Sequence, residues 1–155
     1  MENIRAINER VFQFLQGRWS VHRQFEGSYC GAFQGDANFV PEIGGAPTYR
    51  YTEQGKLTDG AEQRFDAKQS YRYRLSGGKV EVLKREDAEW IVMHQLDFRD
   101  DGRIATAGHT HLCGQDHYTA VYRVDLSGSW EVSYRVTGPK KEYRICTKYS
   151  RLTEG

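Results

Sequence analysis

The chain has 155 residues, with 22 basic and 21 acidic side chains, so it carries a net charge of +1. This length predicts one domain spanning residues 1–155, and the balanced charge argues against nucleic-acid binding. No apolar run is long enough for a transmembrane helix, the N-terminus lacks the apolar segment of a secretory signal, and the three cysteines show no paired spacing. We therefore expect a cytoplasmic protein whose partners include neither nucleic acid nor a membrane.

A short amphipathic helix is predicted at the start of the chain. Its apolar positions recur at helical spacing: Ile4, Ile7, Val11, Phe14 and Leu15. Asn3 is suited to the N-cap, and Gly17 is suited to ending the helix. We expect this helix, residues 3–15, to cap one end of the structure that follows.

After Gly17 the hydrophobic period changes to two, which is typical of strands with one buried face. The alternation predicts ten strands, at residues 19–25, 33–39, 49–53, 65–73, 80–82, 90–98, 109–113, 118–124, 130–136 and 143–149. Because the connections are short, we expect neighbouring strands to pair antiparallel in series. The predicted fold is all-β, a closed antiparallel up-and-down barrel of about ten strands with the helix at one end. A sandwich of two sheets is the alternative.

The first strand opens with Gly17-Arg18-Trp19, which resembles the Gly-x-Trp start of lipocalins and the wider calycin superfamily. Other segments, spread over nearly the whole chain, are similar to a domain family of unknown function that is described as small calycin-like barrels. These segments are residues 15–19, 31–39, 51–55, 94–98, 109–116, Tyr118 and 130–143. The resemblance implies a lipocalin-like or fatty-acid-binding-like barrel that holds a small ligand inside. It also implies an arginine across the opening tryptophan, and Arg144 and Arg151 are the candidates.

We assign the strand faces that carry large apolar residues to the interior. Trp19 and Tyr51 then belong to an aromatic lining. The same faces carry many polar groups: Arg23, Glu53, Gln69, His94, His109, His111, Cys113, Asp116 and Thr147. Burying such groups without partners costs a few kcal/mol each, so they must pair with one another, with water or with a ligand.

The densest polar group is His109-Thr110-His111-Leu112-Cys113, whose alternate residues share a face. We expect a binding site on the wall formed by this strand and its neighbours. Its predicted ligand-binding residues are His94, His109, His111, Asp116 and Tyr118, with Arg23, Glu53, Trp19 and Tyr51. The histidines could instead be core residues that hydrogen-bond tyrosine and aspartate. Zinc or haem could also bind a histidine here, but no spacing identifies a motif, so the cofactor stays open and no metal ligand is assigned.

The predicted function is that of a small-molecule binding protein with an aromatic, polar lumen. We expect a planar ligand, partly aromatic, that carries polar or anionic groups, because tyrosine and tryptophan rings offer stacking surfaces. Arg23 could bind a carboxylate or phosphate of this ligand or pair internally with Glu53.

Two other functional classes fit the same residues. An enzyme of the isomerase, cyclase or hydrolase type would use His109 or His111 as base and Asp116 or Glu53 to orient it. A structural or partner-binding module would have histidines locked in a tyrosine network with no opening. Either a monomer or a homodimer is compatible with the sequence.

Overall fold

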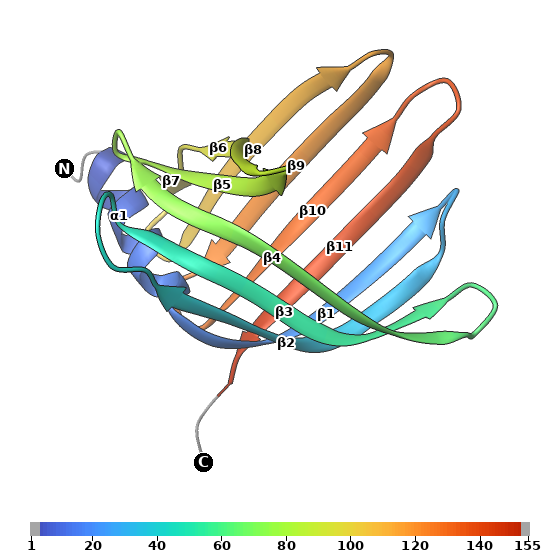
Figure 1. Ribbon diagram of the computed structural model, residues 1–155. Helices are drawn as coiled ribbons and strands as arrows, with labels where there is room; N and C mark the ends of the chain where they lie inside the picture. The colour runs from blue at the N-terminus through green and yellow to red at the C-terminus, as the bar shows by residue number, and fades with distance from the viewer. Residues whose placement is uncertain (1–3, 153–155) are drawn as a thin grey trace.

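The computed structural model describes residues 4–152 and consists of one helix and eleven strands (Figure 1). In chain order the elements are α1 (Ile4–Leu15), β1 (Gly17–Gly27), β2 (Gly31–Pro41), β3 (Thr48–Asp59), β4 (Arg64–Ser76), β5 (Lys79–Glu86), β6 (Glu89–Leu96), β7 (Arg99–Asp100), β8 (Ile104–Cys113), β9 (Asp116–Asp125), β10 (Ser129–Thr137) and β11 (Glu142–Arg151). All ten predicted strands are present, and the eleventh is the two-residue β7. The predicted N-cap, Asn3, lies outside the described residues. No described helix has the length and apolar character needed to cross a membrane.

The strands form one antiparallel sheet in the order β6-β5-β4-β3-β2-β1-β11-β10-β9-β8-β7. Because β1 pairs with both β2 and β11, the first and last strands of the chain are neighbours at the centre of the sheet. The sheet curls through 271° around its apolar face, which confirms the all-β class and the antiparallel pairing. Successive strands pair in series except after β6, which pairs with neither β7 nor β8.

The predicted closure of the barrel is wrong, because the sheet is an open half-barrel with β6 and β7 as its edges. The short β7 pairs with the start of β8, Arg99 opposite Thr106, and so occupies that part of the β8 edge. Between β6 and β8 the contact is made through the side chain of His109. The backbone N–H of Gln95 donates to His109 Nδ1 at 3.4 Å, and the rings of His94 and His109 are 5.2 Å apart.

A β-bulge in β6 changes which residues face the lumen. Val82 pairs with His94, but the next residue of β5, Leu83, pairs with Val92, so one residue of β6 is skipped. Alternation predicted Trp90 and Val92 on the same inward face as His94. The bulge instead turns them to the outer face, where Val92 is 46% exposed and the guanidinium of Arg72 lies 4.4 Å from the Trp90 ring centre.

The helix α1 lies across one end of the curled sheet (Figure 1). Its apolar face is buried there, and the ring of Phe12 stacks on Tyr49 with centres 4.2 Å apart. The helix ends as predicted before Gly17, whose φ of +117° suits glycine. Trp19 Nε1 donates to the carbonyl of Leu15 at 2.9 Å, which ties the opening motif of β1 to the end of the helix.

An arginine does lie across this tryptophan, and it is Arg151 rather than Arg144. The Arg151 guanidinium carbon is 4.0 Å from the Trp19 ring centre. Its two terminal nitrogens donate to the carbonyls of Gln16 and Phe14, at 2.6 and 2.5 Å. The last strand therefore holds the C-terminal end of the helix in place.

The buried Asn8 fastens the other side of the helix, and sequence reasoning did not single it out. Its amide nitrogen donates to the carbonyl of Gly78 at 2.7 Å and to Asp97 at 3.0 Å. Its amide oxygen accepts from the backbone N–H of Phe98 at 2.7 Å. One fully buried side chain thus links α1 to the β4–β5 turn and to the segment before β7.

Candidate functional site

A cavity of about 270 Å³ opens on the concave face of the sheet. Its lining comes from β1, β4, β5, β6 and β9 to β11, and it is mostly aromatic and aliphatic. The lining residues are Arg23, Phe25, Gln69, Tyr71, Tyr73, Val82, Met93, His94, Tyr122, Val132, Tyr134, Ile145, Thr147 and Tyr149. Five tyrosine rings and one imidazole meet here because the curl of the sheet brings strands distant in sequence to face one another.

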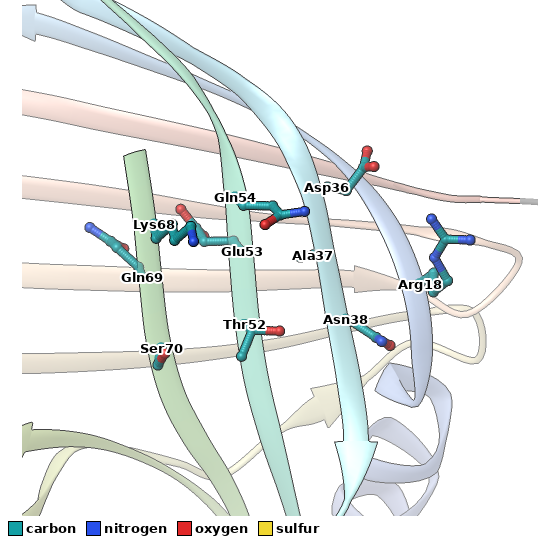
Figure 2. A pocket seen from close by; sticks show the side chains of 10 residues that line it. All are labelled: Arg18, Asp36, Ala37, Asn38, Thr52, Glu53, Gln54, Lys68, Gln69 and Ser70. Carbon is teal, nitrogen blue, oxygen red and sulfur yellow. The ribbon is translucent and has the colours of Figure 1, made fainter. Parts of the chain in front are cut away.

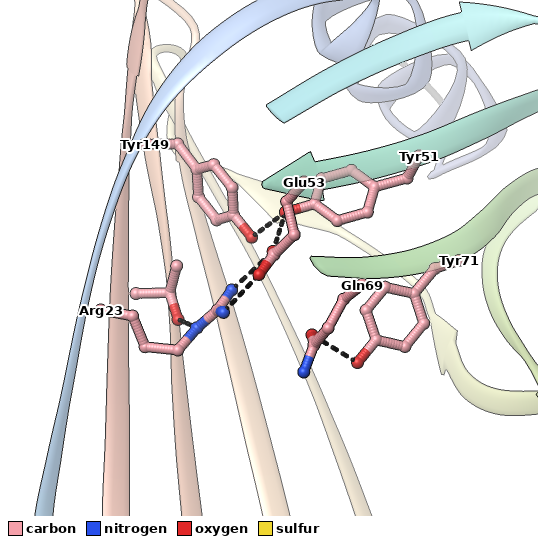
Figure 3. A network of polar contacts seen from close by, with 7 residues as sticks. Arg23, Tyr51, Glu53, Gln69, Tyr71 and Tyr149 are labelled. Atoms are coloured by element: carbon pink, nitrogen blue, oxygen red, sulfur yellow. Dashed lines mark hydrogen bonds and ion pairs between the residues drawn. The ribbon is translucent and has the colours of Figure 1, made fainter. Parts of the chain in front are cut away.

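An ion pair lies at one side of this cavity (Figure 3). Arg23 Nη1 and Nη2 donate to the two carboxylate oxygens of Glu53 at 2.6 and 2.9 Å, and Arg23 Nε donates to Thr147 Oγ1 at 2.8 Å. The Tyr51 hydroxyl donates to Glu53 Oε1 at 2.5 Å and lies 2.9 Å from the Tyr149 hydroxyl. The carboxylate is buried, so these contacts replace the water that it loses.

This pairing decides between the two predicted roles of Arg23. Burial alone lowers the pKa of the guanidinium, but its hydrogen bonds and ion pair with Glu53 outweigh burial and raise the pKa above its ordinary value. Arg23 is therefore charged and already neutralised by an internal partner. The geometry is that of the internal Arg–Glu pair, and the carboxylate-binding role would require this pair to be broken.

His94 is the least satisfied polar side chain that lines the cavity. It is 3% exposed, and its Nδ1 lies 2.6 Å from the hydroxyl of Tyr122. Its Nε2 is buried and has no hydrogen-bond partner among the residues that the structure describes. Burial, followed by the nearby charges of His109, His111 and Lys84, lowers the pKa of His94 to about 4, so the imidazole is neutral at pH 7.

The structure brings the predicted histidine wall together as a row of ring contacts. His94 is 5.2 Å from His109, His109 is 5.7 Å from His111, and His111 stacks on Tyr118 with centres 4.9 Å apart. Only His94 of this row lines the 270 Å³ cavity, and the half-buried others continue along β8 and β9 away from it. Burial lowers the pKa of His111, and the charge of His109 lowers it further.

Other predicted site residues lie elsewhere. Asp116 pairs with Lys141, 3.7 Å away, and Cys113 is exposed. Trp19 and Tyr51 are core residues that support the site without lining the cavity. Within the described part of the chain, no three His, Cys, Asp or Glu side chains are arranged to hold a metal ion.

The site residues that sequence reasoning did not assign are mainly the tyrosines. Strand alternation in the sequence puts all five of them on inward faces, but nothing in the sequence indicates that they converge on one cavity: Tyr71, Tyr73, Tyr122, Tyr134 and Tyr149. The strand alternation gives no indication that Met93 faces the lumen, because it does so only through the bulge in β6.

A separate polar depression of about 440 Å³ lies on the outer face of β1 to β4 (Figure 2). The polar side chains that line it alternate along the strands with the inward-facing residues Ala37, Glu53 and Gln69. They are Arg18, Asp36, Asn38, Thr52, Gln54, Lys68 and Ser70. No aromatic ring lines it. Hydrated polar side chains are what an outward strand face ordinarily carries, so we place the candidate site in the lumen.

Comparison with known proteins identifies a matching family and solved structures with a similar fold. The family described as "Family of unknown function (DUF6314)" matches residues 15–151. A search of curated proteins gave no match. Among solved structures, Rv2717c from M. tuberculosis has 12% identity and a TM-score of 0.64, over 93% of this chain and 96% of that one. EF1p2_mFAP2b, solved bound to DFHBI, has 12% identity and a TM-score of 0.50, over 94% and 99% of the two chains. At this identity the likeness establishes a shared fold.

Proposed function

We propose that this chain, which belongs to the family of unknown function DUF6314, is a small-molecule binding protein with its ligand in the lumenal cavity. The observation that carries the proposal is the cavity of about 270 Å³ on the concave face of the sheet, which five tyrosine rings and the imidazole of His94 line. A concave, mostly apolar lining with a few polar groups is the usual form of a small-molecule site.

The lining supports a planar, partly aromatic ligand. Tyr71, Tyr73 and Tyr134 offer ring faces and edges, and Val132 and Ile145 add apolar surface. A cavity of about 270 Å³ lies just below the range of roughly 300–1,000 Å³ that is usual for ligand sites, so we expect a small ligand. The structure of EF1p2_mFAP2b bound to DFHBI adds that a protein of similar fold binds a small molecule.

The enzyme alternative is the weaker one because its residues have other partners. Among the described residues, neither His109 nor His111 is hydrogen-bonded to a carboxylate: His109 accepts from the backbone N–H of Gln95, and His111 stacks on the ring of Tyr118. Glu53 is bound by Arg23 and Tyr51, and Asp116 by Lys141. The predicted base and its orienting carboxylate are therefore not paired.

The rest of the proposal follows from the sequence. The chain acts as one domain in the cytoplasm, an expectation that its three free cysteines support, with a small molecule as partner.

The experiment is native mass spectrometry of the purified protein, to find small molecules that co-purify, with two matched valine variants. Val132→Phe adds a ring inside the cavity, whereas Val121→Phe adds the same ring on the outer face of β9, where Val121 is 44% exposed. Ligand is expected on the wild type and on Val121→Phe but not on Val132→Phe. A wild-type protein that carries and takes up no small molecule, or equal occupancy in both variants, would contradict lumenal binding.

A further inference from the structure

We infer that the histidine wall beside the cavity binds the carboxylate of an aromatic acid, through the ammonium of Lys84 and the imidazoles of His109 and His111. This inference rests on the proposed function and adds the chemical class of the ligand and the residues that select it. The ring of the ligand lies in the cavity and its charged group lies on the wall. The wall begins at the cavity residue His94, whose ring centre is 5.2 Å from that of His109.

The first step is the placement of Lys84. It lies two positions beyond Val82, which lines the cavity, and the bulge beside them skips a residue of β6 and none of β5. The alternation along β5 is therefore regular and turns Lys84 to the same inward face. After burial and the charges of neighbouring imidazoles, the charge of Lys84 further lowers the pKa of His94 and of His111. Lys84 forms no ion pair with a residue that the structure describes, so its charge is uncompensated.

The second step is the proton on His109. Its Nδ1 contacts the backbone N–H of Gln95, and a backbone N–H can only donate, so Nδ1 is the acceptor and carries no proton. The single proton of the neutral imidazole is therefore on Nε2. No described residue accepts from this Nε2–H, so His109 has a donor to offer to a ligand.

The third step is access. Among the described residues, the buried polar side-chain atoms that lack a partner are His94 Nε2 and Trp130 Nε1. Lys84 Nζ, His109 Nε2 and the ring nitrogens of His111 also lack a partner, but they are not among these buried atoms, and the three side chains are partly exposed. A ligand can therefore reach all three groups, whereas it cannot reach Nε2 of His94.

The spacing of the two imidazoles suits one carboxylate. The ring centres of His109 and His111 are 5.7 Å apart, so hydrogen bonds of about 2.8 Å from both rings can end on the two oxygens of the same carboxylate. His111 also stacks on Tyr118, with ring centres 4.9 Å apart, and this contact leaves the edge of the imidazole free.

The other titratable groups that face the wall leave its positive charge in place. They are Glu86 and Glu89 at the ends of β5 and β6, Cys113 and Asp116 at the ends of β8 and β9, Tyr118 of β9 and Tyr134 of β10. Both glutamates are exposed and neither pairs with Lys84, and Asp116 pairs with Lys141. An anion is therefore the complementary ligand, and a metal cation would be repelled by Lys84.

A bound carboxylate also makes protonation of the wall more favourable. Burial lowers the pKa of His111, and the charges of His109 and Lys84 lower it further, so the free wall resists additional positive charge. An anion beside the imidazole reverses this effect and raises its pKa. Binding then takes up protons, so the affinity for a carboxylate should rise as the pH falls, and the affinity for a neutral analogue should not.

The test compares 2-naphthoate with 2-naphthamide, which has the same fused ring and a carbonyl group but no charge. Binding is measured by equilibrium dialysis at pH 7.5 and at pH 6.0, and 2-naphthoate is ionised at both. The wild type is expected to bind 2-naphthoate about tenfold more tightly than 2-naphthamide at pH 7.5, as charge-assisted hydrogen bonds predict. This preference should grow about threefold or more at pH 6.0.

Two variants assign the preference to the wall. Lys84→Met keeps the length of the side chain but not its charge, so the two probes should bind almost equally at pH 7.5. The double variant His109→Phe, His111→Phe keeps two planar rings without their donors, so the gain at pH 6.0 should disappear. The matched controls are Lys148→Met and His117→Phe, because both side chains are exposed on the outer faces of β11 and β9. Both controls should keep the wild-type preference at each pH.

The outcomes separate the two proposals, since binding of 2-naphthamide shows that the cavity of a variant is intact. Equal or weaker binding of 2-naphthoate to the wild type would overturn the role of the wall and leave lumenal binding standing. So would a preference for 2-naphthoate that survives both wall variants, because the carboxylate would then be bound elsewhere. Failure of both probes to bind would overturn this inference, and the absence of a co-purifying ligand as well would remove the proposed function with it.

Discussion

Arg23 and Glu53 form an ion pair with two hydrogen bonds, and it connects β1 to β3 across the intervening β2, inside the half-barrel (Figure 3). The pair has two consequences. It removes net charge from the wall of the cavity, and it places the Tyr51 hydroxyl on the carboxylate, with the Tyr149 hydroxyl next to that of Tyr51. The interior can therefore hold two opposite charges that neutralise each other.

Removal of one partner of this pair should destabilise the fold strongly. Glu53→Ala leaves a buried guanidinium without its counter-charge, and the expected loss in free energy of unfolding is about 3–5 kcal/mol. The double variant Arg23→Met, Glu53→Met removes both charges and should cost less than the sum of the two single changes. Urea unfolding at pH 7 measures the free energy of unfolding of the wild type, the single variants and the double variant. A Glu53→Ala loss below about 1 kcal/mol would show that water enters and compensates the unpaired guanidinium.

The buried His94 should make the fold sensitive to mild acid. Its pKa is about 4 in the folded protein, whereas an ordinary histidine has 6.5, so the unfolded chain takes up a proton in this interval and the folded protein does not. Stability therefore rises with pH between about 4 and 6.5 and is lost as the pH falls through that window. The full loss by pH 4 is about 3 kcal/mol, since each pH step contributes about 1.4 kcal/mol.

The effect of His94 is separated from that of the carboxylates by a variant. The gap in free energy of unfolding between wild type and His94→Gln should shrink as the pH is lowered from 7.5 to 5, because the variant has no imidazole to protonate. The exposed-face variant His22→Gln should keep the pH response of the wild type. A gap that stays constant with pH would mean that the imidazole takes up its proton at the same pH in the folded protein and in the unfolded chain.

How much the sequence predicts depends on whether a feature is local. The period-two pattern located all ten long strands, because each strand has one buried face and short connections to its neighbours. The same pattern placed Arg23 and Glu53 on inward faces. It failed at Trp90 and Val92 because a bulge skips one residue, and alternation cannot register such a skip.

The candidate site is predictable only in part for a similar reason. The contacts between His94, His109 and His111 follow from strand alternation and from the approach of β6 to β8. The cavity itself depends on the curl of the sheet, which brings Tyr71 of β4 opposite Tyr134 of β10, and no local pattern encodes that distance. The unpartnered Nε2 of His94 likewise becomes visible only once every neighbour has a position.

Asn8 should be one of the most sensitive helix positions. Asn8→Ala removes the acceptor of the Phe98 N–H and the donor to the Gly78 carbonyl, both in a buried setting. We expect a loss of about 3 kcal/mol in free energy of unfolding, because each stranded buried group costs roughly 1–3 kcal/mol. Urea unfolding compares this variant with Asn38→Ala on the outer face, which should lose less than about 0.5 kcal/mol. Equal losses would mean that water replaces the Asn8 amide.

The last strand should control the docking of α1 through Arg151. Its guanidinium lies over Trp19 and donates to the carbonyls of Gln16 and Phe14, at the end of the helix where the last carbonyls have no intrahelical donor. Arg151→Ala should therefore cost about 2–3 kcal/mol and reduce the near-ultraviolet circular dichroism of the tryptophans. Arg151→Lys keeps the charge but cannot reach both carbonyls while covering the ring, so its loss should be intermediate. Arg144→Ala, on the exposed face of the same strand, is the matched control and should change stability by less than about 0.5 kcal/mol. If Arg151→Ala were no more costly than Arg144→Ala, the helix would be held by its apolar face and Asn8 alone.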